Sequence, residues 1–435
     1  MTAGNNPRIH VGIIGGGITG VILALALEKR GVSYTLYERA PAFTELGAGI
    51  GFSPNAERAL KVVDPKVYKV YKSVASSHPD EEYFQWVDGS RSNEVMARLL
   101  IGVDEFQGGR RSDFLEAWST LIPSHKTKFS KEIKSIVQKD DGKVALIFKD
   151  GSEEECDVAI GCDGIRSRVR QLILGEANPA AYPRYSKKFC FRALLPMDKA
   201  QQVVGEKRAR ERFMYNGPDA HIITYPVARN AFLNALFVIS DQNAWPSERH
   251  TAPGDKQEAV RVFANWHPAV RGLVDLLPEK LDKWAIFDMY DCPTTHYHLG
   301  SVALAGDAAH ASGPHLGSGA GFGIEDALVL ASVLKLADDE CSRTSGEGRR
   351  HLCRDALAAY NAARFDRDQW LPGATRKAVE LFQWQDEEVR DDRVKFLKHI
   401  TPLYHKIWKN DIDEMVRSAE EQLRLILEKQ STSHL

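Results

Sequence analysis

The sequence predicts an α/β protein in which a Rossmann-like dinucleotide-binding domain is interleaved with a mostly antiparallel sheet and followed by a helical C-terminal segment. Three observations support this prediction. Residues 9–14 form a short apolar run that leads through G-x-G-x-x-G into an amphipathic helix. Residues 186–240 alternate between apolar and polar positions, as antiparallel strands do. Helical patterns dominate from about residue 324 onward.

Length, charge and cysteine usage narrow the class of protein. With 435 residues the chain is too long for one ordinary core, so two domains or one composite domain are expected. A net charge of −2 and the lack of a basic stripe argue against nucleic-acid binding. No run of about eighteen apolar residues predicts a membrane span. The six cysteines are scattered without a C-x-x-C pair, which indicates free thiols in a reducing compartment.

The first part of the chain predicts a βαβ unit and further strands. The helix after the glycine motif ends at Gly31, which suits a C-cap, and residues 33–38 follow as the second strand. A helix is expected from Pro54 to Val63. The segments KEIKSIVQ, KVALIFKDG and ECDVAIGCDG predict strands that end at residue 161.

The second part predicts a sheet, a return to the first domain and a helical end. Strands are expected within 186–240, a helix at about 255–276, and strands at 283–290 and 301–305. The two domains therefore interleave along the chain. The predicted dinucleotide-binding domain comprises residues 1–75, 100–180 and 295–375, the antiparallel-sheet domain residues 76–99 and 181–294, and the C-terminal helices residues 376–435.

The glycine motif predicts a binding site for the ADP half of a dinucleotide. Gly15 allows the tight turn, Gly17 lets a pyrophosphate approach the backbone, and Gly20 lets helix and strand pack closely. The N-terminus of the helix then faces the phosphates. Glu38 ends the second strand about twenty residues on, where a carboxylate can accept hydrogen bonds from the ribose hydroxyls.

A second glycine-rich stretch, GDAAHASGPHLGSGAGFG at residues 306–323, has three candidate functions: a metal site, a hydrolase site or a cradle for a large planar ligand. A metal site lacks a third ligand at a suitable spacing beside His310 and His315. A hydrolase site lacks G-x-S-x-G. We therefore expect no metal, both histidines as scaffold, and local hydrogen bonding by His310.

Residues 157–170, DVAIGCDGIRSRVR, complete a set of three motifs that resembles the flavoprotein aromatic hydroxylases, which are single-component FAD-dependent monooxygenases. The set consists of the N-terminal glycine motif, a strand that leads into Asp163-Gly164 and a strand that leads into Gly306-Asp307. The resemblance extends from about residue 9 to about residue 415. GAGIGFSPNAERAL, RRSDFL and HIITYPV are similar to segments of the salicylate hydroxylase subgroup.

The resemblance implies FAD as the cofactor, NADPH or NADH as a transient reductant and O2 as co-substrate. The residues that it assigns to FAD are Gly15, Gly17, Gly20, Glu38, Gly49, Arg111, Asp163, Asp307, Pro314, Gly317, Gly319, Ala320 and Gly321. Gly317, Gly319, Gly321 and Gly323 are expected in a loop before a helix that starts near residue 324, where backbone N–H groups stabilise reduced flavin. Ser318 and Gly321 stand where the family often has Gln and Asn, so we expect the backbone to bind there.

Two residues in apolar strands are candidates for the substrate site. Arg192 lies in FCFRALLP, where an inward-pointing arginine needs an anionic partner, and Tyr225 lies in HIITYPV. The alternatives are a salt bridge at the sheet edge for Arg192 and an ordinary core position for Tyr225. The catalytic hypothesis is that Arg192 stabilises a phenolate and that Tyr225, on a neighbouring strand, orients its oxygen.

An Arg and Tyr pair also resembles the fungal polyketide-modifying branch of this subgroup, the resorcinol dearomatases, as does EKLDKWAIFDM at residues 279–289. This branch implies that a flavin hydroperoxide hydroxylates a substituted carbon of a phenol in secondary metabolism, which breaks aromaticity. The first alternative is decarboxylative hydroxylation of salicylate, whose carboxylate would bind Arg192. The second is a non-catalytic protein that reuses the FAD fold for binding.

Location and assembly are predicted from the two ends of the sequence. The N-terminal residues lack the layout of a signal peptide, and the expected location is the cytoplasm. Ser433, His434 and Leu435 differ from the S-K-L peroxisomal address by one residue, which makes the peroxisome the alternative. Tyr404 and Trp408 leave two alternatives open, a homodimer interface or a core position.

Overall fold

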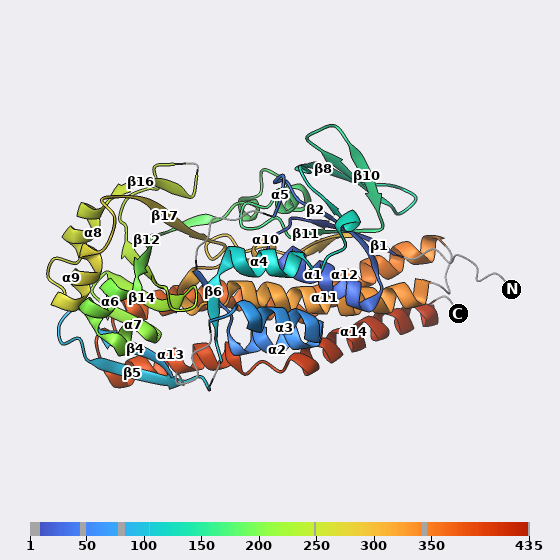
Figure 1. Ribbon diagram of the computed structural model, residues 1–435. Coiled ribbons are helices and arrows are strands. Elements are labelled where there is room, and N and C mark those ends of the chain that lie inside the picture. The colour runs from blue at the N-terminus through green and yellow to red at the C-terminus, as the bar shows by residue number, and fades with distance from the viewer. Residues whose placement is uncertain are drawn as a thin grey trace.

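The computed structural model describes residues 9–43, 49–76, 83–103, 105–247, 249–341 and 346–433. Two main sheets lie toward opposite ends of an elongated molecule, and long helices run along its length (Figure 1). The arrangement confirms the predicted α/β class with an interleaved antiparallel sheet and a helical C-terminal segment.

The first sheet has six strands, which are parallel except at one edge. In spatial order they are β18 (His298–Leu299), β19 (Val302–Leu304), β11 (Val158–Gly161), β1 (His10–Ile14), β2 (Ser33–Tyr37) and β7 (Thr127–Lys128). The predicted βαβ unit is confirmed, with α1 (Ile18–Arg30) between β1 and β2 and Gly31 as its left-handed C-cap at φ 70°. Because parallel strands end at the same edge, the segments after β1, β11 and β19 meet there.

The second sheet has eight strands and is antiparallel except between β13 and β4. In spatial order they are β16 (Thr251–Asp255), β17 (Lys280–Asp288), β12 (Arg184–Pro196), β15 (Phe232–Ser240), β14 (Ala220–Val227), β13 (Phe213–Gly217), β4 (Tyr83–Asp88) and β5 (Val95–Leu100). One face carries Phe191, Phe213 and Phe237 into a core. The opposite face carries the alternate positions, among them Arg192 and Tyr225, toward the first domain.

Four helices cover the core face of the second sheet. They are α6 (Met197–Val204), α7 (Glu206–Arg210), α8 (Lys256–Val262) and α9 (Pro268–Asp275). The single helix expected at about 255–276 is therefore wrong, because α8 and α9 are separate. The break falls before Pro268, since proline disfavours helical backbone at the residue that precedes it.

The remaining elements are short strands and helices. They are a three-stranded sheet of β10 (Glu153–Cys156), β9 (Val144–Phe148) and β8 (Ile133–Gln138), a pair of β3 (Gly49–Gly51) and β6 (Gly108–Arg110), and the helices α2 (Pro54–Val63), α3 (Pro65–Val74), α4 (Arg111–Ser119), α5 (Arg168–Leu174) and α10 (Asp307–His310). The predicted helix from Pro54 to Val63 is confirmed as α2.

The helix expected to start near residue 324 is α11 (Gly319–Cys341), which begins five residues earlier. Gly321 and Gly323 therefore lie inside its first turns rather than in a loop. A Cβ on Gly323 would lie 2.2 Å from Thr19 Oγ1, and one on Gly321 would lie 3.0 Å from Ala56 Cβ. The glycines are thus tolerated in a helix because they let α11 pack closely on α1 and α2.

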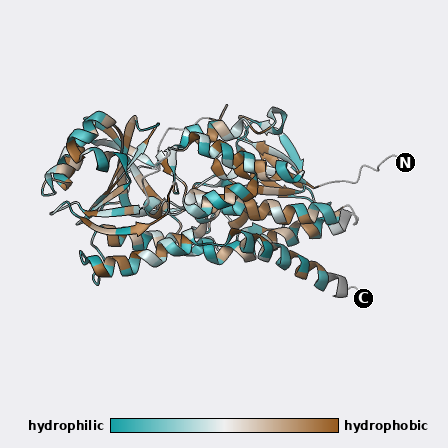
Figure 2. Cartoon of the chain, turned by 60° about the horizontal axis from the view of Figure 1, so that its bottom comes forward, coloured by the Kyte–Doolittle hydropathy of each residue, from teal (hydrophilic) through white to brown (hydrophobic). Residues whose placement is uncertain are grey.

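The last three helices are α12 (Gly346–Phe382), α13 (Arg393–Trp408) and α14 (Ile412–Ser433). α12 reaches two cores, with Tyr360 in that of the first domain and Phe382 in an aromatic cluster under β4. Tyr404 and Trp408 of α13 are buried in the same cluster, so their core alternative is the correct one. α14, which leads to the C-terminus, mixes hydrophilic and hydrophobic positions, as a helix with one buried face does (Figure 2). α11, by contrast, is buried over most of its length.

Two predictions from composition are also settled. All six cysteines are free thiols. Over the described ranges, no helix is both long and apolar enough to cross a membrane.

Candidate active site

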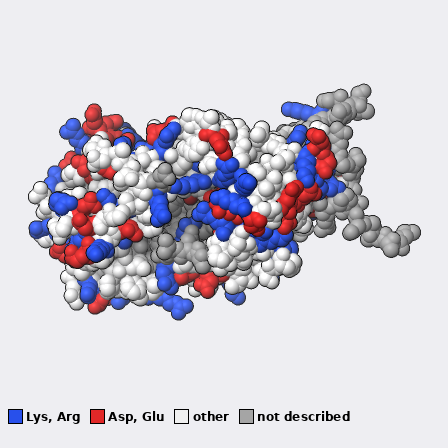
Figure 3. Space-filling model, turned by 90° about the horizontal axis from the view of Figure 1, so that it is seen from above, with Lys and Arg blue, Asp and Glu red and all other residues white. Residues whose placement is uncertain are grey.

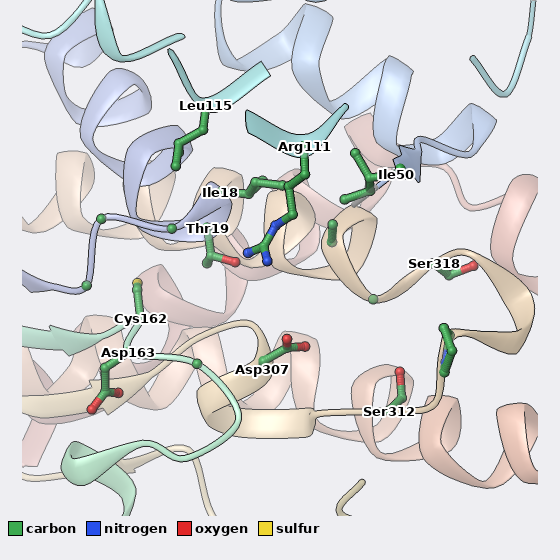
Figure 4. Close-up of a pocket in the computed structure, with 18 of the residues that line it drawn as sticks. Ile18, Thr19, Ile50, Arg111, Leu115, Cys162, Asp163, Asp307, Ser312 and Ser318 are labelled. Atoms are coloured by element: carbon green, nitrogen blue, oxygen red, sulfur yellow. The ribbon is translucent and has the colours of Figure 1, made fainter. Parts of the chain in front are cut away.

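One large cavity of about 960 Å³ lies between the carboxyl ends of the first sheet and the open face of the second. Its wall brings together most of the residues that the sequence predicts for cofactor and substrate. They are Gly15, Gly17, Glu38, Gly49, Arg111, Asp163, Arg192, Tyr225, Asp307, Pro314, Gly317, Gly319 and Ala320. Figure 4 shows part of this wall, where the Arg111 side chain reaches toward Thr19 and Asp307.

The glycine motif gives the cavity an anion-binding end. Gly17 is the N-cap of α1, so the N–H groups of the first turn have no intrahelical acceptor. A guanidinium nitrogen of Arg111 lies 3.9 Å from the position that a Cβ on Gly17 would take. A helix N-terminus and a guanidinium on one side of a cavity suit a pyrophosphate. Gly20 does not line the cavity; a Cβ there would lie 2.0 Å from the Gly15 carbonyl oxygen, so this glycine serves close packing.

Glu38 is held in the wall by two backbone amides. Its carboxylate accepts hydrogen bonds from the N–H groups of Gly16 at 2.6 Å and Ala40 at 2.7 Å. Each carboxylate oxygen retains acceptor capacity for a further donor. A diol at this point of the cavity would therefore find an oriented acceptor.

The N-terminus of α11 forms a second set of unpaired donors. The first helical bond runs from Phe322 N–H to the Ser318 carbonyl, which leaves the N–H groups of Gly319, Ala320 and Gly321 without helical acceptors. Gly319 and Ala320 line the cavity. Gly321 does not, contrary to the prediction, because its α-carbon faces α2.

Asp307 and Asp163 lie in the same wall but differ in what their carboxylates do. Asp307 begins α10, and its Oδ1 lies 3.8 Å from the Cβ position of Gly319, across from the start of α11. Asp163 instead caps α5, where it accepts from Ser167 Oγ at 2.5 Å and Arg168 N–H at 2.7 Å. Figure 4 shows the Asp163 carboxylate turned away from Asp307. Burial raises the pKa of Asp163, although these hydrogen bonds act in the opposite direction.

Beneath the loop, His310 makes the local hydrogen bond that the sequence predicts. Its Nε2 lies 2.7 Å from Asp326 Oδ2, and the same oxygen accepts from Gly306 N–H at 2.8 Å. Burial alone would lower the pKa of His310, but Asp368 and Asp326 outweigh burial and raise it to about 9. His310 is therefore a buried cation that holds the turn before Asp307.

The sequence did not predict that acidic side chains surround His310. His310, Asp326 and Asp368 come close enough together to offer three ligand atoms to a metal ion, which the spacing in sequence had argued against. Arg364 already pairs with both carboxylates and also with Glu325, at 2.7 Å. A cationic side chain thus takes the position that a metal would need.

Arg192 and Tyr225 both face the cavity, but the prediction that they lie on neighbouring strands is wrong. β15 lies between β12 and β14, with Leu236 opposite Arg192 and Asn234 opposite Tyr225. β12 is an inner strand of the sheet, so a salt bridge at the sheet edge is also wrong for Arg192. Instead, the guanidinium lies over Trp284, 4.8 Å from the ring centre.

Tyr225 is half-buried and forms part of the cavity wall. Burial raises its pKa to about 12, although Arg192 and Arg212 act to lower it. Tyr225 is therefore a neutral phenol at ordinary pH and can donate a hydrogen bond. Arg212 is a second cation here that sequence reasoning missed, although it directly precedes the apolar run FMYNG; it donates to the Phe106 carbonyl at 2.7 Å.

His315, expected to be scaffold, lies in the cavity wall. Burial, His221 and nearby cations lower its pKa well below the usual value, so the imidazole is neutral. Its ring centre lies 5.5 Å from that of His221, whose Nδ1 lies 3.2 Å from Gln383 Nε2. A neutral imidazole at this point can accept or donate one hydrogen bond.

The cavity as a whole favours anions. Among its described lining residues, Lys and Arg are twice as frequent as Asp and Glu. Figure 3 shows one face of the molecule with a hollow near its middle, and Lys and Arg side chains gather at its border. A ligand with phosphates and an ionised ring substituent matches this charge distribution.

Comparison with known proteins agrees with this site. The family described as FAD binding domain matches residues 8–351. FAD-dependent monooxygenase pigN of Monascus ruber is 45% identical over 97% of this chain and 98% of its own length. Salicylate hydroxylase asL1 of Sarocladium schorii is 34% identical over 98% of this chain and 93% of its own length. A solved salicylate hydroxylase substrate complex superposes with a TM-score of 0.82 at 28% identity, over 95% of this chain and 98% of that one.

Proposed function

Because the chain belongs to the FAD binding domain family and is an FAD-dependent monooxygenase, as its relatives are, we propose that it carries out hydroxylative dearomatisation of a polyketide-derived phenol. Aromatic hydroxylation in secondary metabolism is the broader function that these relatives support. The non-catalytic alternative is therefore wrong. The observation that carries the proposal is Arg192, a guanidinium that pairs with no carboxylate of the described residues, in the same cavity wall as the neutral donor Tyr225.

The cavity fits FAD at each of the positions that matter. The α1 N-terminus and Arg111 would hold the pyrophosphate, and Glu38 would accept from the ribose. The free N–H groups at the start of α11 would face the ring, with Asp307 beside them. Gly20 and Gly321 would act through packing. FAD, when bound, accepts two electrons from NADPH or NADH and with O2 supplies an electrophilic oxygen atom.

The chain's own residues would prepare the phenol. Arg192 favours the ionised form, because an opposite charge at contact distance lowers the pKa of a phenol. Tyr225, which keeps its proton, donates to the same oxygen and fixes which ring carbon faces the oxygen source. Phenol, O2, reduced nicotinamide and a proton would give the hydroxylated product, water and oxidised nicotinamide. If the attacked carbon carries a substituent, it has no proton to lose and the product stays a dienone.

Salicylate is the second candidate substrate, favoured by the solved substrate complex and by the relative from Sarocladium. Its carboxylate would pair with Arg192 in the same cavity. Hydroxylation of the carbon that bears the carboxylate would then release carbon dioxide and give catechol.

Product analysis of the FAD-loaded protein tests the proposal. With reduced nicotinamide and an alkylated resorcinol aldehyde, we expect a product heavier by one oxygen that has lost its aromatic absorbance, and faster nicotinamide consumption than without the phenol. Catechol and carbon dioxide from salicylate, with the resorcinol untouched, would select the second candidate. Hydrogen peroxide as the sole product with every phenol would overturn both.

For location and assembly we retain the cytoplasm as the proposal and the peroxisome as its alternative. His434 and Leu435 lie outside the described residues. A fluorescent protein fused to the N-terminus, with the C-terminal tripeptide present or removed, separates the two compartments. A homodimer stays a prediction that light scattering tests, and its interface would not use the buried Tyr404 and Trp408.

A further inference from the structure

Arg192 is held in the cavity wall without a counter-charge. Its Nε is buried and has no hydrogen-bond partner among the described residues, and no described carboxylate lies at ion-pair distance. An arginine taken out of water in this way costs free energy unless something stabilises its charge. The neighbour that does so is Trp284, whose ring centre lies 4.8 Å from the guanidinium carbon.

Strand register places Trp284 under Arg192. Trp284 on β17 is the direct partner of Cys190 on β12, and Arg192 follows two residues later on the same face. Trp284 packs against Cys190, Val238 and Ile286, which hold its side chain in place. Both Trp284 and Arg192 line the cavity.

We propose that Trp284 is a positioning residue that holds the Arg192 guanidinium flat and leaves its N–H edge free for the anionic oxygen of the substrate. The inference rests on the proposed function, in which Arg192 binds a phenolate or carboxylate. An aromatic face attracts a cation but accepts no in-plane hydrogen bond and carries no net charge. A carboxylate in its place would bind the same N–H groups and cancel the positive charge. Trp284 thereby sets the preference of the site for ionised over neutral phenols.

Titration of the FAD-loaded protein with two probes tests this role, using the flavin absorbance to follow binding. The first probe is a resorcinol aldehyde, which ionises, and the second is its di-O-methyl ether, which cannot. Trp284→Leu should weaken binding of the ionised probe about threefold to thirtyfold, the range of a cation–π contact. Trp284→Phe should recover most of this loss, because it keeps an aromatic face. Binding of the ether should change little in either variant.

The pH profile gives a readout that loss of structure alone would not move. In the wild type, Arg192 should lower the pH at which the probe binds as its anion, and Trp284→Leu should shift that pH upward. Trp245→Leu is the matched control, because Trp245 lies in the same domain, contacts the Tyr185 ring and is not among the described residues that line the cavity. Its probe affinities and pH profile should match those of the wild type.

A double-mutant cycle separates failure of this inference from failure of the proposed function. In the Arg192→Ala background, Trp284→Leu should add no further loss for the ionised probe. An equal loss in that background, or an equal loss for the ether, would overturn the positioning role and make Trp284 a direct contact of the ring. If Arg192→Ala itself leaves binding of the ionised probe unchanged, the assignment of Arg192 is wrong and the inference falls with it.

Discussion

Arg364 in the core and Arg192 in the cavity wall are stabilised in opposite ways. Arg364 is fully buried and pairs with Glu325, Asp326 and Asp368. Arg192 is half-buried, has an aromatic face beneath it, and pairs with no carboxylate of the described chain. The first arrangement satisfies the charge within the protein, so Arg364 is structural. The second leaves the charge of Arg192 without a carboxylate partner among the described residues, which supports the proposal that Arg192 binds an anionic ligand.

Loss of Arg364, the arginine that pairs with three acids, should have the largest effect, and the effect should be on stability. Arg364→Met removes the guanidinium that pairs with Glu325, Asp326 and Asp368 and leaves Arg367 beside Glu325 and His310 beside Asp326, and we expect the free energy of unfolding to fall by about 3–5 kcal/mol. Chemical denaturation followed by circular dichroism measures this. Arg91→Met is the control, since Arg91 pairs with Asp391 at the surface and should cost at most about 1 kcal/mol. Equal stability of the two variants would contradict a structural role for Arg364.

Loss of the unpaired arginine should spare the fold and impair catalysis. Arg192→Ala removes a charge-assisted hydrogen bond, so kcat/KM should fall by the equivalent of about 1.5–3 kcal/mol while FAD content and melting temperature stay close to wild type. The deficit should shrink as pH rises, because the phenol then ionises without help. Steady-state kinetics across pH checks both points. A variant with full activity would remove the ligand-binding role from Arg192.

The buried cluster of Arg364, His310 and their acidic partners should also make the free energy of unfolding depend on pH. The pKa of His310 is about 9 in the folded protein and near 6.5 in the unfolded chain. Its contribution is therefore complete below pH 6.5 and is lost as pH rises through 9, with a slope of at most about 1.4 kcal/mol per pH unit. Burial lowers the pKa of Lys188 to about 8, which acts in the opposite direction. The difference in melting temperature between wild type and His310→Gln measures the contribution of His310 to stability. If this difference does not change with pH, His310 is not charged in the folded protein.

Tyr225 should give the smallest effect. Tyr225→Phe removes one hydrogen bond to the phenolate, about 1.5 kcal/mol in kcat/KM at the lower end of the range for a charged acceptor, and leaves the positive charge of Arg192 in place. The expected signature is a mixture of hydroxylation positions, resolved by chromatography of the products. A single product at the wild-type rate would show that another group orients the substrate, and the neutral imidazole of His315 is the nearest alternative in the wall.

The features that could be predicted from the sequence are those whose signal lies within a few adjacent residues. Gly15, Gly17 and Glu38 follow from local spacing, and Arg192 follows from a charge within an apolar strand. Trp284 could not be found in this way, because its contact depends on β17 lying beside β12 and on the register of that pair. The contacts of His310 with Asp326 and Asp368 likewise depend on how α11 and α12 pack.

The start of α11 was misplaced for a different reason. Gly319, Gly321 and Gly323 have poor helix propensity, so the sequence favours a loop. Close packing against Thr19 and Ala56 outweighs that propensity, since larger residues would collide there. Tertiary contact, rather than local preference, decides where this helix begins.

The 37-residue helix α12 has a consequence for how ligands reach the cavity. It is anchored in the first core at Tyr360 and in the aromatic cluster at Phe382. A hinge motion that separated the two sheets would have to bend α12 or remove Tyr360 or Phe382 from its core. Apart from bending at Pro372, which lies between these two anchors, we expect reductant, substrate and product to reach the cavity through movements of loops and single side chains.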